Sequence, residues 1–292
     1  MFPMKTFQTT DARTLSYQAG GNGPLLVLLP GGPGLDPVSY FAGAVVPGFR
    51  QLVFCPRGTG LSDPPASPEG YRIAGYVSDV EELRNHLGAE QLTLCGSSHG
   101  ATIALAYAIA HPERVDRMIL AGGPARMDAA FWQASDRARE RFRATATDGA
   151  DRLDAADAAG PAMRSAGTDA ERRDAMRIVM NTYLGHPSPT RTGLLERLVA
   201  APMNFAAPEP MIAEMMSGLD LLRDAATMTV RTLVIGAELD VRVPTEHLQE
   251  IVDAIPGAQL ALIAGAGHLA HLEASQQWAE TVGDFLRGNS RA

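Results

Sequence analysis

The sequence predicts an α/β fold in which a mainly parallel sheet is covered by helices on both faces. Short apolar runs bounded by Gly and Pro recur along the chain, segments with helical periodicity separate them, and one long stretch interrupts the alternation. Parallel strands need crossover connections, and the crossover helices pack on the faces of the sheet. Alternating strands and helices therefore predict a doubly covered parallel sheet.

The strand candidates begin with two at the amino end, near Lys5–Thr9 and Thr14–Ala19. Later candidates are apolar at successive positions rather than at alternate ones, which is typical of strands covered on both faces. Four of these buried-strand candidates lie in the first half of the chain, at Leu25–Leu29, Gln51–Cys55, Gln91–Cys95 and Val115–Gly122. Two more follow near the carboxyl end, at Arg231–Gly236 and Gln259–Gly265.

Helices are expected between the strand candidates. The segment Ile73–Leu87 has one apolar stripe at helical spacing, formed by Tyr76, Val80, Leu83 and Leu87. Gly88 follows that segment as a stop signal. An Ala-rich helix is expected at residues 101–111, directly before Pro112. The remaining helix candidates are Pro244–Ile255 and Glu273–Leu286.

The stretch that interrupts the alternation, residues 124–227, contains no convincing buried strand. It has helical patterns rich in Ala, Arg and Met, and its Pro and Gly residues predict breaks near Gly160–Pro161, Gly185–Pro189 and Pro202–Pro210. We interpret this stretch as a helical cap, or lid, inserted between two core strands. The expected division is a core of residues 1–123 and 228–292 and a cap of residues 124–227.

Composition narrows the classes of function. Of the 292 residues, 46% are hydrophobic and 20% charged, and the formal net charge is −8. A negative average charge repels phosphate backbones and anionic lipid surfaces, so neither nucleic acid nor a membrane is an expected partner. We see no secretory signal at the amino end and no apolar run long enough to span a bilayer, and therefore expect a cytoplasmic protein.

The cysteines and histidines suggest no metal site. Cys55 and Cys95 each end an apolar run, so we expect two buried free thiols rather than a disulfide. The seven histidines are scattered, and no Cys–His spacing resembles a ligand set, so no metal or cofactor is expected. Four histidines are expected at the surface or at helix ends: His86, His111, His186 and His247.

The strongest functional motif is GSSHG at residues 96–100, which matches G-x-S-x-G. A buried-strand candidate runs directly into it and an Ala-rich helix candidate runs directly out, as a nucleophile elbow requires. Small residues avoid clashes at such a sharp turn, and the following helix directs backbone amides toward developing negative charge. We therefore expect Ser98 to be a catalytic nucleophile. The alternative is a tight strand–helix junction without chemistry.

A serine nucleophile needs a base, and the base needs an acid that orients it. After an elbow, the expected chain order is acid and then histidine, each in a loop that follows a strand. Asp240 stands just after the run LVIG, and His268 stands just after the run ALIAG. The sequence therefore predicts a catalytic triad of Ser98, Asp240 and His268.

Neighbouring residues provide an alternative to each partner. Glu238 lies beside Asp240 and is the alternative acid, although we expect it to face solvent. His271 is the alternative base, and its expected role is to line the substrate pocket or cap the last helix. The His99 side chain is a further candidate for the pocket wall because it adjoins the nucleophile.

The oxyanion of a tetrahedral intermediate needs two backbone N–H donors. One is expected from His99, the residue after the nucleophile. The other is expected from the loop Pro30–Gly34, because glycines let amides approach an oxyanion without obstruction. Gly32 is the first candidate and Gly31 the second, and Gly31 is also a candidate substrate contact. The alternative for this loop is a tight turn without a catalytic role.

Four segments resemble the prolyl aminopeptidase (proline iminopeptidase) branch of the α/β-hydrolases: PGGPG, PRGTGLSD, GSSHG and ALAYAIAHPERV. The resemblance covers roughly residues 5–123 and 228–288 and barely touches the predicted cap. It implies an α/β-hydrolase fold, with the cap inserted between core strands, and hydrolytic chemistry at the elbow.

The sequence departs from that family at three motif positions. Members typically carry HGGPG, DQRGxGxS and GGSWG. In this chain Pro30 replaces the histidine, Cys55-Pro56 replaces Asp-Gln, and His99 replaces the tryptophan. None of these changes touches the predicted triad, so they affect the expected substrate rather than the reaction class.

The predicted cap would choose the substrate. Its candidate substrate contacts are Met203, Phe205 and Met215, which lie near Met211 and Met216. An apolar lining of this kind favours an acyl chain or an aromatic ester. Members of the resembling family recognise a free amino terminus through acidic residues and aromatics in the cap. Glu209 and Glu214 could bind an amine, and a solvent-facing role is their alternative.

The sequence therefore predicts a serine hydrolase that cleaves an ester, lactone or amide bond of a small, apolar acyl substrate through an acyl-enzyme. The first alternative is a prolyl aminopeptidase that releases amino-terminal proline from peptides. The second is a ligand-binding sensor on a hydrolase scaffold. The expected partner is a small molecule or short peptide, and no oligomeric state is predicted.

Overall fold

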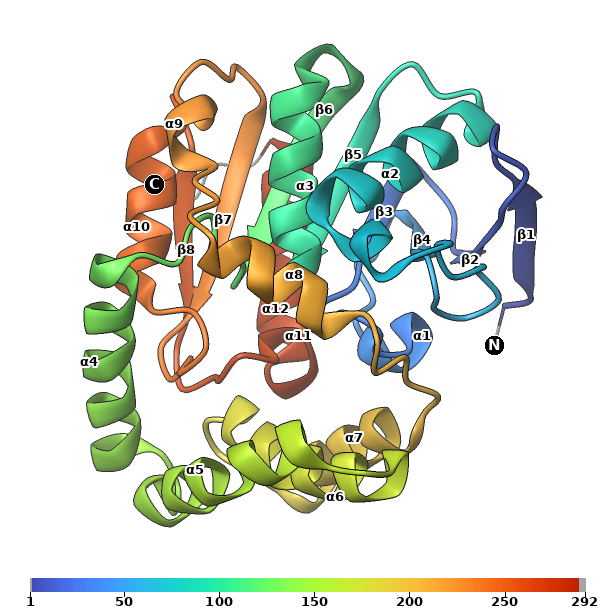
Figure 1. Ribbon diagram of the computed structural model, residues 1–292. Coiled ribbons are helices and arrows are strands. Elements are labelled where there is room, and N and C mark those ends of the chain that lie inside the picture. Colours follow the sequence, from blue (N-terminus) through green and yellow to red (C-terminus); the bar gives the residue numbers. More distant parts are fainter. Residues whose placement is uncertain (1, 289–292) are drawn as a thin grey trace.

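The computed structural model describes residues 2–288 and contains an eight-stranded sheet (Figure 1). In spatial order its strands are β1 (Met4–Gln8), β2 (Thr14–Gly20), β4 (Arg50–Cys55), β3 (Leu25–Leu29), β5 (Leu92–Ser97), β6 (Val115–Ala121), β7 (Arg231–Ala237) and β8 (Gln259–Ile263). β2 pairs antiparallel with β1 and with β4, and every pairing from β4 to β8 is parallel. The predicted mainly parallel α/β fold is confirmed. Residue 1 and residues 289–292 of the expected core lie outside the described residues.

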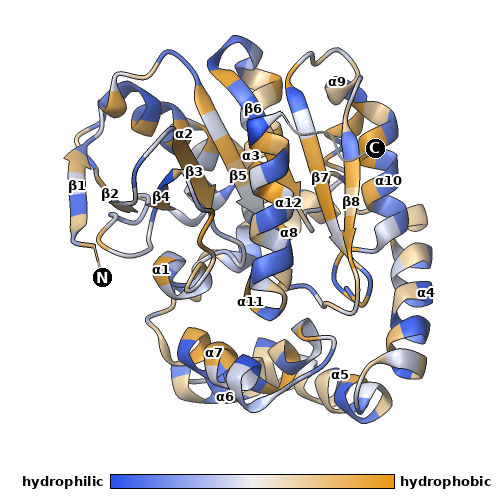
Figure 2. Ribbon diagram, turned by 180° about the vertical axis from the view of Figure 1, so that it is seen from behind, coloured by the Kyte–Doolittle hydropathy of each residue, from blue (hydrophilic) through white to orange (hydrophobic). Residues whose placement is uncertain are grey.

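Helices cover both faces of the sheet. One face packs against α2 (Ile73–Leu87), α3 (His99–Ala110) and α10 (Thr245–Ala254). The opposite face packs against α1 (Pro37–Tyr40) and α12 (Ser275–Arg287), and Figure 2 shows α12 lying across mostly hydrophobic strands. Strand β3 shows why the apolar runs are continuous: Val27 and Leu29 join the first layer, whereas Leu26 and Leu28 join the second.

Residues 122–230 between β6 and β7 form helices and loops. The helices are α4 (Ala129–Thr145), α5 (Gly149–Ser165), α6 (Asp169–Met180), α7 (Pro189–Ala200), α8 (Pro208–Met216) and α9 (Leu222–Ala225). In Figure 1, α5, α6 and α7 lie beyond the ends to which the arrows of β7 and β8 point. This segment therefore stands opposite the carboxyl edge of the sheet, where loops after parallel strands gather. Short 3₁₀ helices occur at Pro68–Tyr71, Pro112–Arg114 and Asn181–Tyr183.

Two helix predictions need correction. The expected break at Gly160–Pro161 is wrong, because both residues lie inside α5. The helix continues to Ser165 although Pro161 has no N–H to donate to the preceding turn. The expected helix Glu273–Leu286 is instead two helices, α11 (Ala270–Glu273) and α12, which are divided at Ala274 with φ of −127° and ψ of 49°. In contrast, α2 has the predicted bounds and ends at Gly88 in the left-handed region, with φ of 62°. No helix within residues 2–288 combines the length and apolarity needed to cross a bilayer.

A buried ion pair ties the loop after β4 to α2. The Arg57 guanidinium donates two hydrogen bonds to the Asp79 carboxylate, at 2.8 and 2.6 Å, and the Arg57 backbone N–H donates a third at 3.1 Å. Asp79 is fully buried, so the guanidinium compensates a charge that water does not reach. This pair accounts structurally for the arginine in PRGTGLSD.

The cysteines lie as predicted, and His247 lies at a helix end, in the first turn of α10, but not at the surface. Cys55 and Cys95 are buried free thiols, and burial raises the pKa of each to about 12. His247 is buried rather than exposed: its Nε2 accepts from the Ala125 N–H at 3.0 Å, and its Nδ1 lies 3.1 Å from the Glu250 carboxylate. Burial lowers the pKa of His247. This histidine therefore joins α10 to the chain leaving β6.

Candidate active site

Ser98 stands at the turn between β5 and α3, where its φ of 52° and ψ of −122° are strained for a non-glycine residue. Its backbone N–H donates to the carbonyl oxygen of Ala121 on β6 at 2.7 Å. A Cβ on Gly96 would lie 2.2 Å from the Gly100 carbonyl oxygen, and one on Gly100 would lie 2.0 Å from the Leu29 carbonyl oxygen. The flanking glycines therefore permit the turn that presents Ser98 at the carboxyl edge of the sheet.

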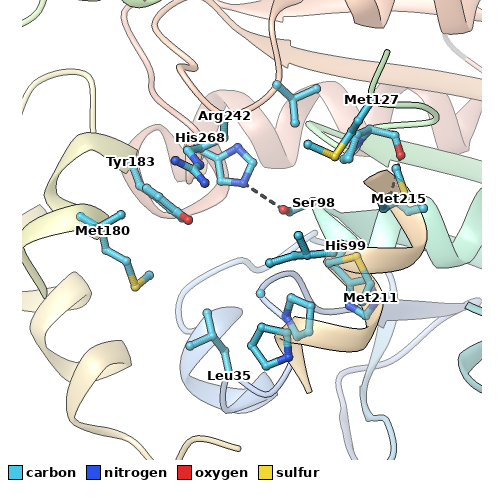
Figure 3. A pocket seen from close by; sticks show the side chains of 18 of the residues that line it. Leu35, Ser98, His99, Met127, Met180, Tyr183, Met211, Met215, Arg242 and His268 are labelled. Atoms are coloured by element: carbon cyan, nitrogen blue, oxygen red, sulfur yellow. Dashed lines mark hydrogen bonds between the residues drawn. The ribbon is translucent and has the colours of Figure 1, made fainter. Parts of the chain in front are cut away.

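Three side chains from separate loops form one hydrogen-bonded chain. Figure 3 marks the hydrogen bond between His268 and Ser98 with a dashed line. His268 Nε2 lies 3.0 Å from Ser98 Oγ, and His268 Nδ1 lies 2.8 Å from Asp240 Oδ2. A carboxylate only accepts, so Nδ1–H donates to Asp240, and Nε2 of the neutral ring accepts from the Ser98 hydroxyl. Asp240 is 3% exposed and His268 is 8% exposed, so little water competes for these bonds. The structure thus brings together the three residues predicted as a triad.

The loop after β7 orients the Asp240 carboxylate. Its Oδ1 accepts hydrogen bonds from the backbone N–H groups of Arg242 at 2.7 Å and Val243 at 3.0 Å. These bonds leave Oδ2 for His268. Glu238, the alternative acid, is exposed and accepts from the Gly265 N–H at 2.9 Å, so it does not contact the histidine.

The loop that carries His268 is anchored by a buried carboxylate, Glu273, which is 6% exposed. Its Oε2 accepts from the N–H groups of Gly267 at 2.8 Å and Gly185 at 2.9 Å, and its Oε1 accepts from that of His186 at 2.7 Å. Glu273 thereby joins the loop after β8 to the loop between α6 and α7. The sequence carries no local signal for this role of Glu273, because Gly185 and Glu273 are 88 residues apart.

The two predicted oxyanion donors flank the nucleophile. Gly32 and His99 both line the cavity onto which Ser98 opens. His99 is the first residue of α3, so its N–H has no helical acceptor. Gly31 lies directly against the nucleophile, because a Cβ there would come within 2.7 Å of Ser98 Cβ and 2.3 Å of Tyr40 Oη. Only a glycine fits this position.

Two other histidines near Ser98 are held neutral by burial. The His99 ring meets Tyr76 edge-on, with 4.6 Å between ring centroids, and burial lowers the pKa of His99 to about 3. His271 was expected to line the pocket, but it lies behind the cavity wall, where its Nε2 donates to the Tyr40 carbonyl oxygen at 2.8 Å. Burial lowers the pKa of His271 to about 4. The expected pocket contact of His271 is therefore wrong.

Ser98 and His268 open onto a cavity of about 260 Å³ between the carboxyl edge of the sheet and the helices that follow β6 (Figure 3). Half of the chain's twelve methionines line it: Met127, Met163, Met176, Met180, Met211 and Met215. Flexible thioether side chains fill irregular apolar space, so this lining suits a small apolar group.

Of the three predicted cap contacts, one lines the cavity and two do not. Met215 lines the cavity. Met203 instead packs against the hydrophobic layer on the α12 face. Phe205 lies under the Arg172 guanidinium, 5.1 Å from its ring centroid, and does not reach the cavity. Sequence proximity to Met215 misled here, because Met203 and Phe205 lie in the loop between α7 and α8 rather than on the helix that carries Met215.

The sequence spacing of four methionines in the cavity wall is a signal for their shared orientation. Met176 and Met180 on α6 are four residues apart, as are Met211 and Met215 on α8. Residues at this spacing share one face of a helix, so each pair can point into one cavity. The sequence does not indicate which helical face meets the cavity, however, since that depends on how the helices dock.

Comparisons with known proteins agree with this architecture. A model of the alpha/beta hydrolase fold family matches residues 24–275. A proline iminopeptidase of Neisseria gonorrhoeae is 35% identical over 118 residues, which are 39% of this chain and 38% of that protein. The chain thus matches little more than a third of the length of this curated relative.

Two solved structures resemble nearly the whole chain. An esterase from Exiguobacterium antarcticum has a TM-score of 0.74 at 21% identity and is matched over 98% of this chain and 100% of that one. An enol-lactonase from Burkholderia xenovorans LB400 has a TM-score of 0.65 at 25% identity and is matched over 97% and 100%. Because the family model spans most of the chain, and because a proline iminopeptidase is among its relatives, this protein belongs to the α/β-hydrolase fold family and resembles the proline iminopeptidase branch.

Proposed function

We propose that this protein is a serine hydrolase that cleaves an ester or lactone bond of a small substrate with an apolar acyl group. The observation that carries the proposal is the hydrogen-bonded chain from Asp240 through His268 to Ser98, which ends at an apolar cavity. All the groups required by the mechanism are side chains or backbone N–H groups of this chain.

In the first half of the reaction, Ser98 Oγ attacks the substrate carbonyl carbon while His268 Nε2 accepts the hydroxyl proton. The Asp240 carboxylate stabilises the imidazolium that forms. The backbone N–H groups of Gly32 and His99 donate to the oxyanion. Collapse of the tetrahedral intermediate breaks the bond to the leaving oxygen, which receives the proton from His268, and an acyl-enzyme remains on Ser98.

In the second half, water attacks the acyl carbon and transfers a proton to His268 Nε2. Collapse of the second intermediate breaks the bond to Ser98 Oγ, which takes the proton back. The carboxylic acid product leaves, and the neutral histidine is restored. The burial of His99 and His271, which lowers their pKa values to about 3 and 4, keeps these rings uncharged beside the reacting groups.

The cavity wall supports an ester or lactone over a peptide with a free amino terminus. No Asp or Glu within residues 2–288 lines the cavity, so a substrate ammonium group would meet no carboxylate there. Glu214, a candidate amine ligand, accepts the Ile73 N–H at 2.7 Å. Glu209 is exposed near the start of α8 and does not line the cavity. We therefore keep the prolyl aminopeptidase as the second candidate, supported by the relatedness of the core.

The experiment that tests the proposal combines covalent labelling with turnover. We expect a fluorophosphonate to label the wild-type protein and p-nitrophenyl butyrate to be hydrolysed much faster than proline p-nitroanilide. Ser98→Ala should abolish labelling and lower turnover by at least about 10⁴-fold. Ser97→Ala is the matched control, because its hydroxyl bonds to Tyr40 Oη at 2.9 Å rather than to His268.

Each alternative predicts a different result in this experiment. Robust amide hydrolysis with negligible ester hydrolysis would replace the esterase proposal with the aminopeptidase. A correctly folded wild-type protein that never reacts with the fluorophosphonate and hydrolyses neither substrate would support the sensor.

A further inference from the structure

The wall of the cavity carries one arginine, Arg242, and no Lys, Asp or Glu among the described residues. Arg242 follows Asp240 by two residues in the loop after β7. Its side chain lies beside Tyr183 and His268 in Figure 3. An otherwise apolar cavity therefore has one positive charge, carried by an exposed side chain, on the side where the proposed base stands.

The guanidinium of Arg242 is held by an aromatic stack rather than by an acid. It lies 5.4 Å from the centroid of the Tyr183 ring, and that ring meets the His268 ring edge-on with 5.0 Å between centroids. Such a cation–π contact uses a ring face and leaves the N–H donors of the guanidinium free to bind oxygen atoms. The position of Arg242 is thus set relative to the proposed base.

Several other arginines around the helical segment have carboxylate partners. Arg126 pairs with Asp128, and Arg141 pairs with Glu246. Arg242 forms no salt bridge within the described chain. Although the protein has a formal net charge of −8, no acidic side chain among the described residues pairs with Arg242. Its guanidinium is therefore available to pair with an anionic ligand in the cavity.

We propose that Arg242 binds a carboxylate of the substrate, so that the substrate class is an ester or lactone that also carries a carboxylate close to the scissile bond. This inference rests on the proposed function and narrows it. A guanidinium binds a carboxylate through two parallel N–H···O bonds. One cation matches the single charge of a carboxylate, whereas it would neutralise only half of the double charge of a phosphate monoester.

The apolar and charged parts of the wall then have separate tasks. The methionines of α6 and α8 contact the hydrocarbon part of the substrate, and Arg242 fixes its charged end beside His268. A substrate anchored in both ways has a defined orientation over Ser98. This orientation places its carbonyl carbon within reach of the nucleophile and so speeds the reaction. Arg242 is a specificity-determining residue in this arrangement and takes no proton.

The test compares substrates that differ in charge and little in shape. One pair is 3-carboxyphenyl butyrate with 3-carbamoylphenyl butyrate, in which the charge is on the leaving group. The other is monomethyl adipate with methyl adipamate, in which it is on the acyl group. We expect the wild type to prefer the carboxylate member of at least one pair by about ten- to a hundredfold in kcat/KM, mainly through KM.

Variants at two arginines decide where the preference arises. Arg242→Gln should remove it, and Arg242→Lys should keep part of it, because lysine retains the charge but loses the paired donors. Arg223→Gln, a change at an exposed arginine outside the cavity, should leave the preference as it is. Circular dichroism and melting temperature establish that each variant is folded.

Two results would overturn the inference: no carboxylate preference in the wild type for either pair, or a preference that Arg242→Gln retains. Labelling of Ser98 by a fluorophosphonate separates this failure from failure of the proposed function. If Ser98 labels and neutral esters are hydrolysed, only the carboxylate site is wrong. If Ser98 neither labels nor supports turnover, the proposed function is wrong as well, and the carboxylate site falls with it.

Discussion

The cavity has two walls that are built differently. On the sheet side, Ser98, Asp240 and His268 each follow the end of a strand, and backbone hydrogen bonds set their positions. On the helical side, methionines of α5, α6 and α8 reach the cavity as flexible side chains on docked helices. Strand pairing determines where the reacting atoms lie, whereas helix docking determines which side chains surround the substrate.

This difference shows how one reaction can serve several substrates. The resemblance to proline iminopeptidases lies in the sheet wall, where the proposed chemistry occurs. The helical wall lacks the expected acidic recognition of an amino terminus and presents methionines instead. Changes to Ser98, Asp240 or His268 should therefore cause large losses in kcat, and changes in the helical wall should shift preferences among substrates.

The largest expected effect is that of Asp240→Asn in the sheet wall. An amide in place of the carboxylate can donate to His268 Nδ1 and so favours the wrong tautomer, and we expect kcat to fall by about 10⁴-fold. Steady-state ester hydrolysis measures this loss. Glu238→Gln is the matched control and should change kcat little, because Glu238 is exposed. Equal losses in the two variants would contradict the assignment of the acid.

Glu273→Gln tests the hydrogen bonds that join the His268 loop of the sheet wall to the loop between α6 and α7 of the helical wall. The variant replaces a buried carboxylate that accepts three backbone N–H groups, and we expect the free energy of unfolding to fall by about 2–3 kcal/mol. Ester turnover should also decrease, since the His268 loop loses its anchor. Chemical denaturation measures the change. Glu280→Gln, at an exposed position on α12, should be neutral, and a neutral Glu273→Gln would contradict the anchoring role.

Buried neutral histidines behind the sheet wall should make the protein sensitive to acid. The pKa of His271 is about 4 in the fold and about 6.5 when unfolded, so the unfolded chain binds the extra proton between these values. Stability is therefore full above about pH 6.5 and should fall as the pH drops toward 4, by up to about 1.4 kcal/mol per pH unit from this residue.

His271→Gln tests that dependence, because glutamine can still donate to the Tyr40 carbonyl oxygen but does not titrate. Urea unfolding from pH 7 to pH 4.5 should show a shallower loss of stability in the variant than in the wild type. His99, with a pKa of about 3, also destabilises the fold as the pH falls. Part of the pH dependence of stability should therefore remain in the variant. Identical slopes for both proteins would show that His271 is not buried in its neutral form.

The smallest expected effect belongs to the helical wall. Met211→Ala enlarges the cavity, and we expect the preference among p-nitrophenyl esters to shift toward longer acyl chains by about tenfold in kcat/KM, the amount that one or two methylene groups contribute. Met216→Ala, at an exposed position on the same helix, should leave the preference unchanged. A shift of the same size in both variants would mean that α8 does not present Met211 to the substrate.

The sequence by itself determined the alternation of strands and helices, the bounds of α2, and the three residues that converge at the sheet edge. These features follow local rules: apolar runs mark buried strands, and a strand that enters a glycine-flanked serine dictates a sharp turn. Because the carboxyl ends of parallel strands meet at one edge, the positions of Asp240 and His268 after their strands were enough to predict that they would lie near Ser98.

Only the tertiary structure decided which residues form the helical wall. Met203 and Phe205 looked equivalent to Met215 in the sequence, yet only Met215 lines the cavity. The role of Glu273 as a link between distant loops and the position of Arg242 against Tyr183 were equally invisible. The physical reason is that helical periodicity identifies an apolar face, but the rotation and docking of each helix depend on contacts between residues far apart in the chain.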